Sequence, residues 1–281
     1  MDIIKAIILG IVEGITEWLP VSSTGHLIIV EHFLGLNQSA DFKLMFDYVI
    51  QLGAILSVVV IFFHTLNPFS RTKSSKEVQR TWQLWAKIVV ACVPAVIVAL
   101  PLNSWFDANF NKYVPVAIML IIYGVAFIVI ERYWVPNHQF KVTRVSQISY
   151  RMALIIGGFQ VLSLMPGTSR SGATIVGALL IGISRVAGAE FSFFLGIPAM
   201  VGMSGLKLIK FFTAGNSLSL YQFFIVLVAF VVAFAVSMFT IRWLMNYVKN
   251  HDFTFFGKYR IALGVILLVI ALVTALLGQA A

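Results

Sequence analysis

Two polar segments carrying hydroxyl, carboxylate, imidazole and guanidinium groups lie within an otherwise very apolar chain. The first covers residues 13–26 (EGITEWLPVSSTGH) and the second covers residues 160–172 (QVLSLMPGTSRSG). They align without a gap at a constant offset of 147 positions, so that Ser22 meets Ser169. Two related segments of this kind predict one site that is built from the two halves of a repeat.

Two carboxylates open the first segment. Glu13 and Glu17 are four residues apart, which places both on one face of a helix. Carboxylates in an apolar layer are costly unless a cation or a proton compensates them. Oxygen ligands of this type suit Mg²⁺ or Ca²⁺, so we predict that both residues bind a divalent metal ion. The alternative is that both carboxylates face a water-filled opening and are simply solvated.

Hydroxyl groups and a histidine close the first segment. Ser22, Ser23 and Thr24 precede Gly25 and His26. A hydroxyl within reach of an imidazole is a candidate nucleophile, and a histidine is a candidate general base or acid near neutral pH. Equally, the hydroxyl groups can cap a helix that starts near Gly25, with the histidine as a structural hydrogen-bonding residue.

The second segment is typical of an anion site. Gly167 and Gly172 let the backbone approach an anion closely, and the following helix presents free N–H groups. Arg170 supplies a planar fork that matches phosphate oxygens. Further hydroxyl donors are Thr168, Ser169 and Ser171. The alternative partner of Arg170 is Glu13 or Glu17 in a salt bridge, and the two roles are compatible.

The composition places this site in a membrane. Hydrophobic residues make up 60% of the 281 residues, charged residues make up 11%, and the mean hydropathy is +0.95. A soluble protein would carry roughly twice that charged fraction. We attribute the net charge of +9 to cytoplasmic loops rather than to substrate steering, and we expect no nucleic-acid partner. The start, MDIIKA, lacks the features of a cleavable signal peptide.

Apolar runs predict the arrangement of the chain. Six segments approach the roughly 20 residues that cross a bilayer. They are 44–63, 86–102, 114–131, 188–209, 222–245 and 260–278. The regions 2–36 and 148–183 are each broken by a polar segment into arms that are too short to cross. We therefore predict two re-entrant helical hairpins whose tips are covered by protein.

The fold class that follows is an all-α integral membrane protein forming a single domain over residues 1–281. Repeat 1 covers about 1–131 and repeat 2 about 148–281, each with one hairpin and three transmembrane helices. Three is odd, so the second repeat is inverted relative to the first. Basic residues assign three loops to the cytoplasm, namely 64–85, 132–147 and 246–259. The hairpins then enter from opposite sides and meet near the midplane.

The chain resembles the bacterial undecaprenyl pyrophosphate phosphatase family of the bacitracin-resistance type. The resemblance lies in these two motifs, in residues 46–55 (FDYVIQLGAI), in the length and in the pattern of apolar segments. The resemblance covers essentially the whole chain. It implies hydrolysis of undecaprenyl diphosphate, which recycles the lipid carrier for peptidoglycan and other envelope polymers, and resistance to bacitracin. It also implies a divalent metal and a multi-pass protein of the bacterial cytoplasmic (inner) membrane, with its site towards the periplasm. The family's functional residues fall on Glu13, Glu17, Ser23, His26 and Arg170.

Two mechanisms remain open at this point. Either Ser23 attacks the terminal phosphorus with His26 as its base, or His26 activates water directly. The groups expected to bind the polyprenyl diphosphate are Ser22, Thr24, Gly167, Thr168, Ser169, Ser171 and Gly172. Membrane lipid is a further expected partner, and a homodimer is a further prediction. The alternative function is a transporter or flippase of an anionic polyprenyl phosphate lipid, because inverted repeats and broken helices are also typical of transporters.

Overall fold

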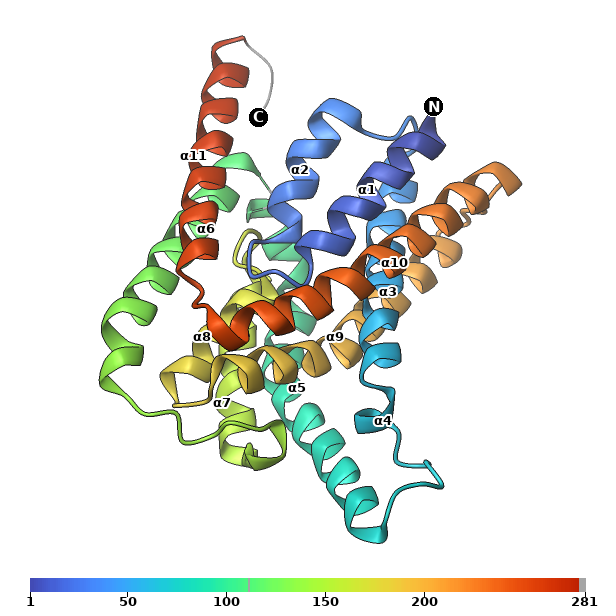
Figure 1. Cartoon of the computed structure of the whole chain (residues 1–281). Helices are drawn as coiled ribbons and strands as arrows, with labels where there is room; N and C mark the ends of the chain where they lie inside the picture. Colours follow the sequence, from blue (N-terminus) through green and yellow to red (C-terminus); the bar gives the residue numbers. More distant parts are fainter. Residues whose placement is uncertain (111, 278–281) are drawn as a thin grey trace.

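The computed structural model describes residues 1–110 and 112–277, and no β-strand occurs in that part of the chain (Figure 1). Six of its helices are long and apolar enough to cross a membrane, with mean hydropathies between 1.5 and 2.8. They are α3 (Ala40–Ile61), α5 (Ser75–Phe110), α6 (Tyr113–Val129), α9 (Arg185–Thr213), α10 (Leu220–Asn250) and α11 (Thr254–Leu276). The predicted all-α fold with six helices able to span a membrane is confirmed. Residue 278, the end of the last predicted apolar segment, lies outside the described residues.

The connecting loops are shorter than the hydropathy pattern predicts. Helix α5 already begins at Ser75, inside the predicted loop 64–85. Its start is fixed by a reciprocal cap, in which the Ser74 hydroxyl accepts from the Glu77 N–H and the Glu77 carboxylate accepts from the Ser74 N–H. The first turns of this helix are polar, and a pattern of apolar length alone therefore places them in the loop.

Four short helices form the two predicted hairpins. Helices α1 (Asp2–Thr16) and α2 (Ser23–Leu34) form the first, and α7 (Tyr150–Val161) and α8 (Arg170–Leu180) form the second. Helices of 11 to 15 residues are about 17–23 Å long, which is less than the hydrocarbon core of about 30 Å. The hairpins open towards opposite ends of the molecule and their tips lie close together (Figure 1). Their re-entry into a bilayer stays a prediction.

The packing repeats the sequence offset. Helix α1 packs on α10, and its equivalent α7 packs on α5, so each hairpin rests on the second long helix of the other repeat. Gly10 and Gly157 occupy equivalent positions in these two contacts. A Cβ atom would lie 2.7 Å from the Ala229 carbonyl oxygen at Gly10 and 2.1 Å from the Ala91 carbonyl oxygen at Gly157. Close backbone approach through glycine therefore occurs twice, as an inverted repeat requires.

Gly157→Ala tests this contact directly. The new Cβ atom cannot fit against Ala91 without moving α7, and such overpacking costs about 1–3 kcal/mol. We expect the midpoint of thermal unfolding in detergent to fall by about 4 °C or more. Gly158→Ala is the matched control, because no atom lies within 4 Å of the Cβ position at Gly158. Equal midpoints for the two variants would show that the glycine contact is not required.

Candidate active site

Equivalent serines start the inner helices of both hairpins. Ser22 caps α2 and accepts from the Gly25 N–H at 3.3 Å, and Ser169 caps α8 and accepts from the Gly172 N–H at 3.2 Å. Their φ angles are 74° and 68°, and in the described chain no other non-glycine residue has a positive φ. Such backbone costs about 1–3 kcal/mol per residue and persists where the surroundings impose it. The capping alternative thus holds for Ser22, and α2 starts at Ser23 rather than near Gly25.

The two tips contact each other through Ser171. Its hydroxyl is buried and lies 3.3 Å from the carbonyl oxygen of Glu17 and 3.4 Å from that of Leu19. It also lies 3.1 Å from the hydroxyl of Ser169. We predicted Ser171 as a substrate donor, but the structure directs its hydroxyl to the backbone of the first hairpin. Its visible role is to join the hairpins.

Arg260 holds both tips from α11. Its fully buried guanidinium group donates to the carbonyl oxygens of Gly167 at 2.8 Å and Thr168 at 2.9 Å in the second hairpin, and to that of Pro20 at 3.1 Å in the first. The group also lies over the ring of Tyr123. The role of Arg260 could not be predicted from the sequence, because an arginine at the start of an apolar segment looks like an ordinary interfacial residue.

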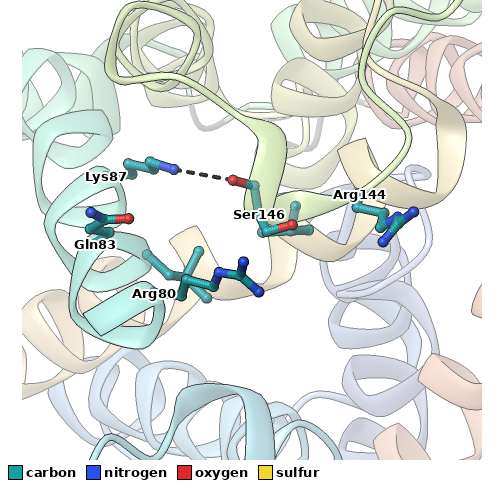
Figure 2. Close-up of a pocket in the computed structure, with 7 residues that line it drawn as sticks. Arg80, Gln83, Lys87, Arg144 and Ser146 are labelled. Atoms are coloured by element: carbon teal, nitrogen blue, oxygen red, sulfur yellow. Dashed lines mark hydrogen bonds between the residues drawn. The ribbon is translucent and has the colours of Figure 1, made fainter. Parts of the chain in front are cut away.

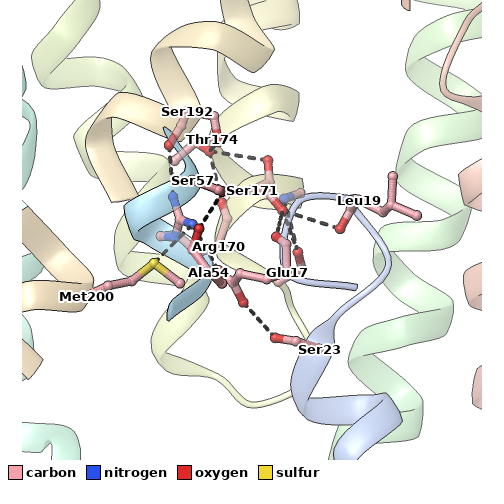
Figure 3. A network of polar contacts seen from close by, with 12 residues as sticks. Glu17, Leu19, Ser23, Ala54, Ser57, Arg170, Ser171, Thr174, Ser192 and Met200 are labelled. Carbon is pink, nitrogen blue, oxygen red and sulfur yellow. Dashed lines mark hydrogen bonds and ion pairs between the residues drawn. The ribbon is translucent and has the colours of Figure 1, made fainter. Parts of the chain in front are cut away.

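An ion pair between the hairpins forms the centre of the site (Figure 3). Arg170 Nη2 lies 2.9 Å from Glu17 Oε1, and the two side chains are only 12% and 10% exposed. Arg170 Nη1 donates to the carbonyl oxygen of Ser192 on α9 at 2.8 Å. Gly196 leaves the space for this guanidinium group, since a Cβ atom there would lie 2.5 Å from Nη1. The salt bridge that was the alternative role of Arg170 therefore forms, with Glu17 rather than Glu13 as the partner.

Ser23 and His26 have separate partners. Ser23 Oγ donates to Glu17 Oε2 at 2.8 Å, so the carboxylate and not the imidazole contacts this hydroxyl. His26 Nδ1 lies 2.7 Å from the Ser22 carbonyl oxygen, and Nε2 lies 2.7 Å from the Tyr259 hydroxyl. A carbonyl oxygen only accepts, so Nδ1 carries a proton, and in the neutral ring Nε2 then accepts from the Tyr259 hydroxyl. The direct Ser23–His26 hydrogen bond that the nucleophile hypothesis assumed is not formed.

Glu13 is the unusual acid of the site. Its side chain is fully buried and neither carboxylate oxygen has a hydrogen-bond partner, which excludes the solvated alternative. It lies close enough to Glu17, Asp47 and Arg170 to interact with their charges. A buried carboxylate without a partner is expensive, and a cation would compensate it. Among the described residues no group of three His, Cys, Asp or Glu side chains is arranged to hold a metal, so an ion here would need further oxygen ligands.

The other predicted substrate-binding residues differ in position. The Thr168 hydroxyl is buried and has no partner, which makes it an available donor beside the tips. Gly167 has a φ of 91°, a conformation that favours glycine. The N–H of Gly172 is already bonded to Ser169, and Thr24 lies on the exposed side of α2.

The arrangement can support phosphoryl transfer. The Glu17 carboxylate can accept the Ser23 proton, and the Arg170 guanidinium group can bind phosphate oxygens. The N-termini of α2 and α8 both lie at the tips, and helix N-termini favour anions.

Comparison with known proteins shows the family of the chain. The profile of the family described as bacitracin resistance protein BacA matches residues 6–266. The undecaprenyl-diphosphatase of Lactococcus lactis subsp. lactis (strain IL1403) is 64% identical over 284 residues, covering 99% of this chain and all of the relative. Those of Streptococcus gordonii and Streptococcus suis (strain 05ZYH33) are 59% and 57% identical and cover 98% or more of both chains. The chain therefore belongs to the BacA bacitracin resistance protein family.

Proposed function

We propose that this protein hydrolyses undecaprenyl diphosphate to undecaprenyl phosphate and inorganic phosphate. The observation that carries the proposal is the continuous contact from Ser23 through Glu17 to Arg170 across the two hairpins. Relatives that are 56–65% identical over nearly their whole length are named undecaprenyl-diphosphatases. The reaction recycles the lipid carrier for peptidoglycan and other envelope polymers, and it gives resistance to bacitracin.

Binding of the diphosphate changes the partners of the central ion pair. Phosphate oxygens compete with Glu17 for the Arg170 fork, while Ser192 keeps the guanidinium group in place through its carbonyl oxygen. The positive charge of Arg260 and the hydroxyl of Thr168 lie beside the same tips. These groups stabilise the charge that develops during phosphoryl transfer.

The released carboxylate then acts on the nucleophile. Ser23 Oγ attacks the terminal phosphorus and its proton passes to Glu17 Oε2. The bond from that phosphorus to the bridging oxygen breaks, and undecaprenyl phosphate leaves. Water hydrolyses the phosphoserine in a second step, which releases inorganic phosphate. The competing route uses His26 Nε2 to activate water directly, with the ring oriented by Ser22.

The proposed cofactor is a divalent metal ion, Mg²⁺ or Ca²⁺. The unpartnered carboxylate of Glu13 supports it, and Glu17 would be the second protein ligand. Oxygens of the substrate would complete the set, because Mg²⁺ is often bound through one or two carboxylates plus phosphate oxygens. Such an ion would neutralise phosphate charge and orient the terminal group.

The protein is a multi-pass membrane protein. We assign it to the bacterial cytoplasmic membrane with its site towards the outer, periplasmic face. Two of the basic loops adjoin the base of the second hairpin, because the Lys141 N–H donates to the Gly182 carbonyl oxygen and the Phe253 N–H donates to the Glu131 carboxylate that also holds Arg185. Basic loops lie on the cytoplasmic side, so the first hairpin opens outwards.

Gly202 and Gly205 on α9 have open space beside them, so a contact through these residues would join two copies. A homodimer stays a prediction.

Phosphate release by the purified protein tests the proposed function. We expect release from undecaprenyl diphosphate in detergent, where no transmembrane gradient exists. A pure transporter or flippase would release none, so its absence with well-folded protein would overturn the proposal.

Ser23→Ala tests the nucleophile in the same assay. Removal of the attacking hydroxyl should lower kcat by about 10³-fold or more. Ser217→Ala removes an exposed hydroxyl in the loop between α9 and α10, outside the site, and should stay within about threefold of wild type. A Ser23→Ala variant that retains more than about a tenth of the wild-type kcat would favour activation of water by His26.

Removal of the metal tests the proposed cofactor. Chelation with EDTA should lower phosphate release at least about tenfold, and Mg²⁺ or Ca²⁺ should restore it. The same ions should raise the unfolding temperature of the wild type but not of Glu13→Gln. Glu190→Gln is the control, because this half-buried carboxylate on α9 takes no part in the contacts described at the hairpin tips. Full phosphate release in the presence of EDTA would contradict the proposed requirement for a divalent metal ion.

A further inference from the structure

A second group of cationic side chains surrounds a cavity that shares no residue with the candidate active site. The cavity has a volume of about 280 Å³ and lies between α5 and the segment that precedes α7 (Figure 2). One wall is a single face of α5, with residues at positions 80, 83, 84 and 87, which follow the helical spacing. The lining residues are Arg80, Gln83, Leu84, Lys87, Arg144, Val145 and Ser146.

The charge of this cavity is entirely positive. Arg80, Lys87 and Arg144 line it, and no carboxylate does. The ion pairs in the described part of the chain are Arg170–Glu17 and Arg185–Glu131, so none of these three cations is neutralised by an acid. Three like charges around one cavity repel each other, and an anion between them removes that repulsion. Two arginine forks and one ammonium group suit the oxygens of a phosphate.

Aromatic residues place the cavity at the depth of lipid headgroups. Trp82, on the next face of α5, is 52% exposed and packs edge-on against Phe69. Tyr150, at the start of α7, is also exposed and lies under the ammonium group of Lys87. Exposed tryptophan and tyrosine residues near the ends of transmembrane helices mark the membrane–water interface.

The cavity also joins two elements that support the second hairpin. Lys87 Nζ lies 3.4 Å from the Ser146 carbonyl oxygen, which links α5 to the segment before α7 (Figure 2). Ala91, one turn further along α5, is the residue against which Gly157 packs. A ligand that holds Arg80 and Arg144 together would therefore stabilise the contact between α5 and α7.

We propose that this cavity binds the phosphate of an anionic phospholipid headgroup from the adjoining leaflet. Basic pockets between transmembrane helices on the side of the basic loops are a known way in which membrane proteins recognise such headgroups. The site is separate from the diphosphate site at the hairpin tips, and its ligand is bound without being converted.

Lipid retention by the purified full-length protein tests this site. Native mass spectrometry in detergent, with titration of phosphatidylglycerol or phosphatidylcholine, measures binding of an anionic and a zwitterionic phospholipid. We expect preferential binding of phosphatidylglycerol, weakened about tenfold or more in Arg80→Gln/Arg144→Gln, as loss of charge-assisted hydrogen bonds implies. The control Arg71→Gln/Lys76→Gln removes the same charge from exposed positions nearby that do not line the cavity, and it should bind like wild type.

Three results would overturn the proposal. Equal weakening in both double variants would show diffuse attraction, and equal binding of the two lipids would remove the anionic preference. Displacement of phosphatidylglycerol by millimolar inorganic phosphate would identify soluble phosphate as the ligand. Normal phosphate release by the candidate active site would show that each variant is folded. The variant Arg80→Lys/Arg144→Lys keeps both positive charges and should restore part of the lipid binding.

Discussion

The structure depends on the burial of one ion pair between two hairpins that are far apart in the sequence. Separating Glu17 from Arg170 would leave a charge in an apolar interior, and breaking such a buried pair typically costs about 3–5 kcal/mol. In the absence of substrate, each hairpin therefore supplies the charge partner of the other. Ser171 and Arg260 add backbone contacts between the same two tips, and the strained serine caps persist because these contacts fix the tips.

The same pair connects fold and chemistry. Glu17 holds Arg170 with one carboxylate oxygen and accepts the Ser23 hydroxyl with the other. A phosphate that draws Arg170 away leaves Glu17 free to take the serine proton, so substrate binding and activation of the nucleophile are coupled. Glu13 is buried beside the pair, and its two carboxyl oxygens, which lack hydrogen-bond partners, are the atoms that would bind the proposed metal.

The sequence predicts the architecture better than the contacts of individual side chains. Long apolar runs predict the six transmembrane helices. The ungapped alignment of the two polar segments, in which Ser22 meets Ser169, indicates the repeat. The partners of Ser23 and His26 could not be predicted, because the spacing of two residues along α2 does not say where their side chains point. Ser23 contacts Glu17, and the His26 ring contacts the Ser22 carbonyl oxygen. Arg260 gives no local signal, since its partners are carbonyl oxygens from two distant segments.

A double-mutant cycle on phosphate release tests most directly whether the ion pair acts as one catalytic unit. The cycle compares Glu17→Gln, Arg170→Gln and the double variant with wild type, all as folded protein in the same detergent. Groups that act as a unit are strongly non-additive, so each single variant should lose about 10²–10³-fold in kcat and the double variant should lose no more than the worse single variant. Losses that multiply in the double variant would mean that the two residues act independently, which would contradict the account.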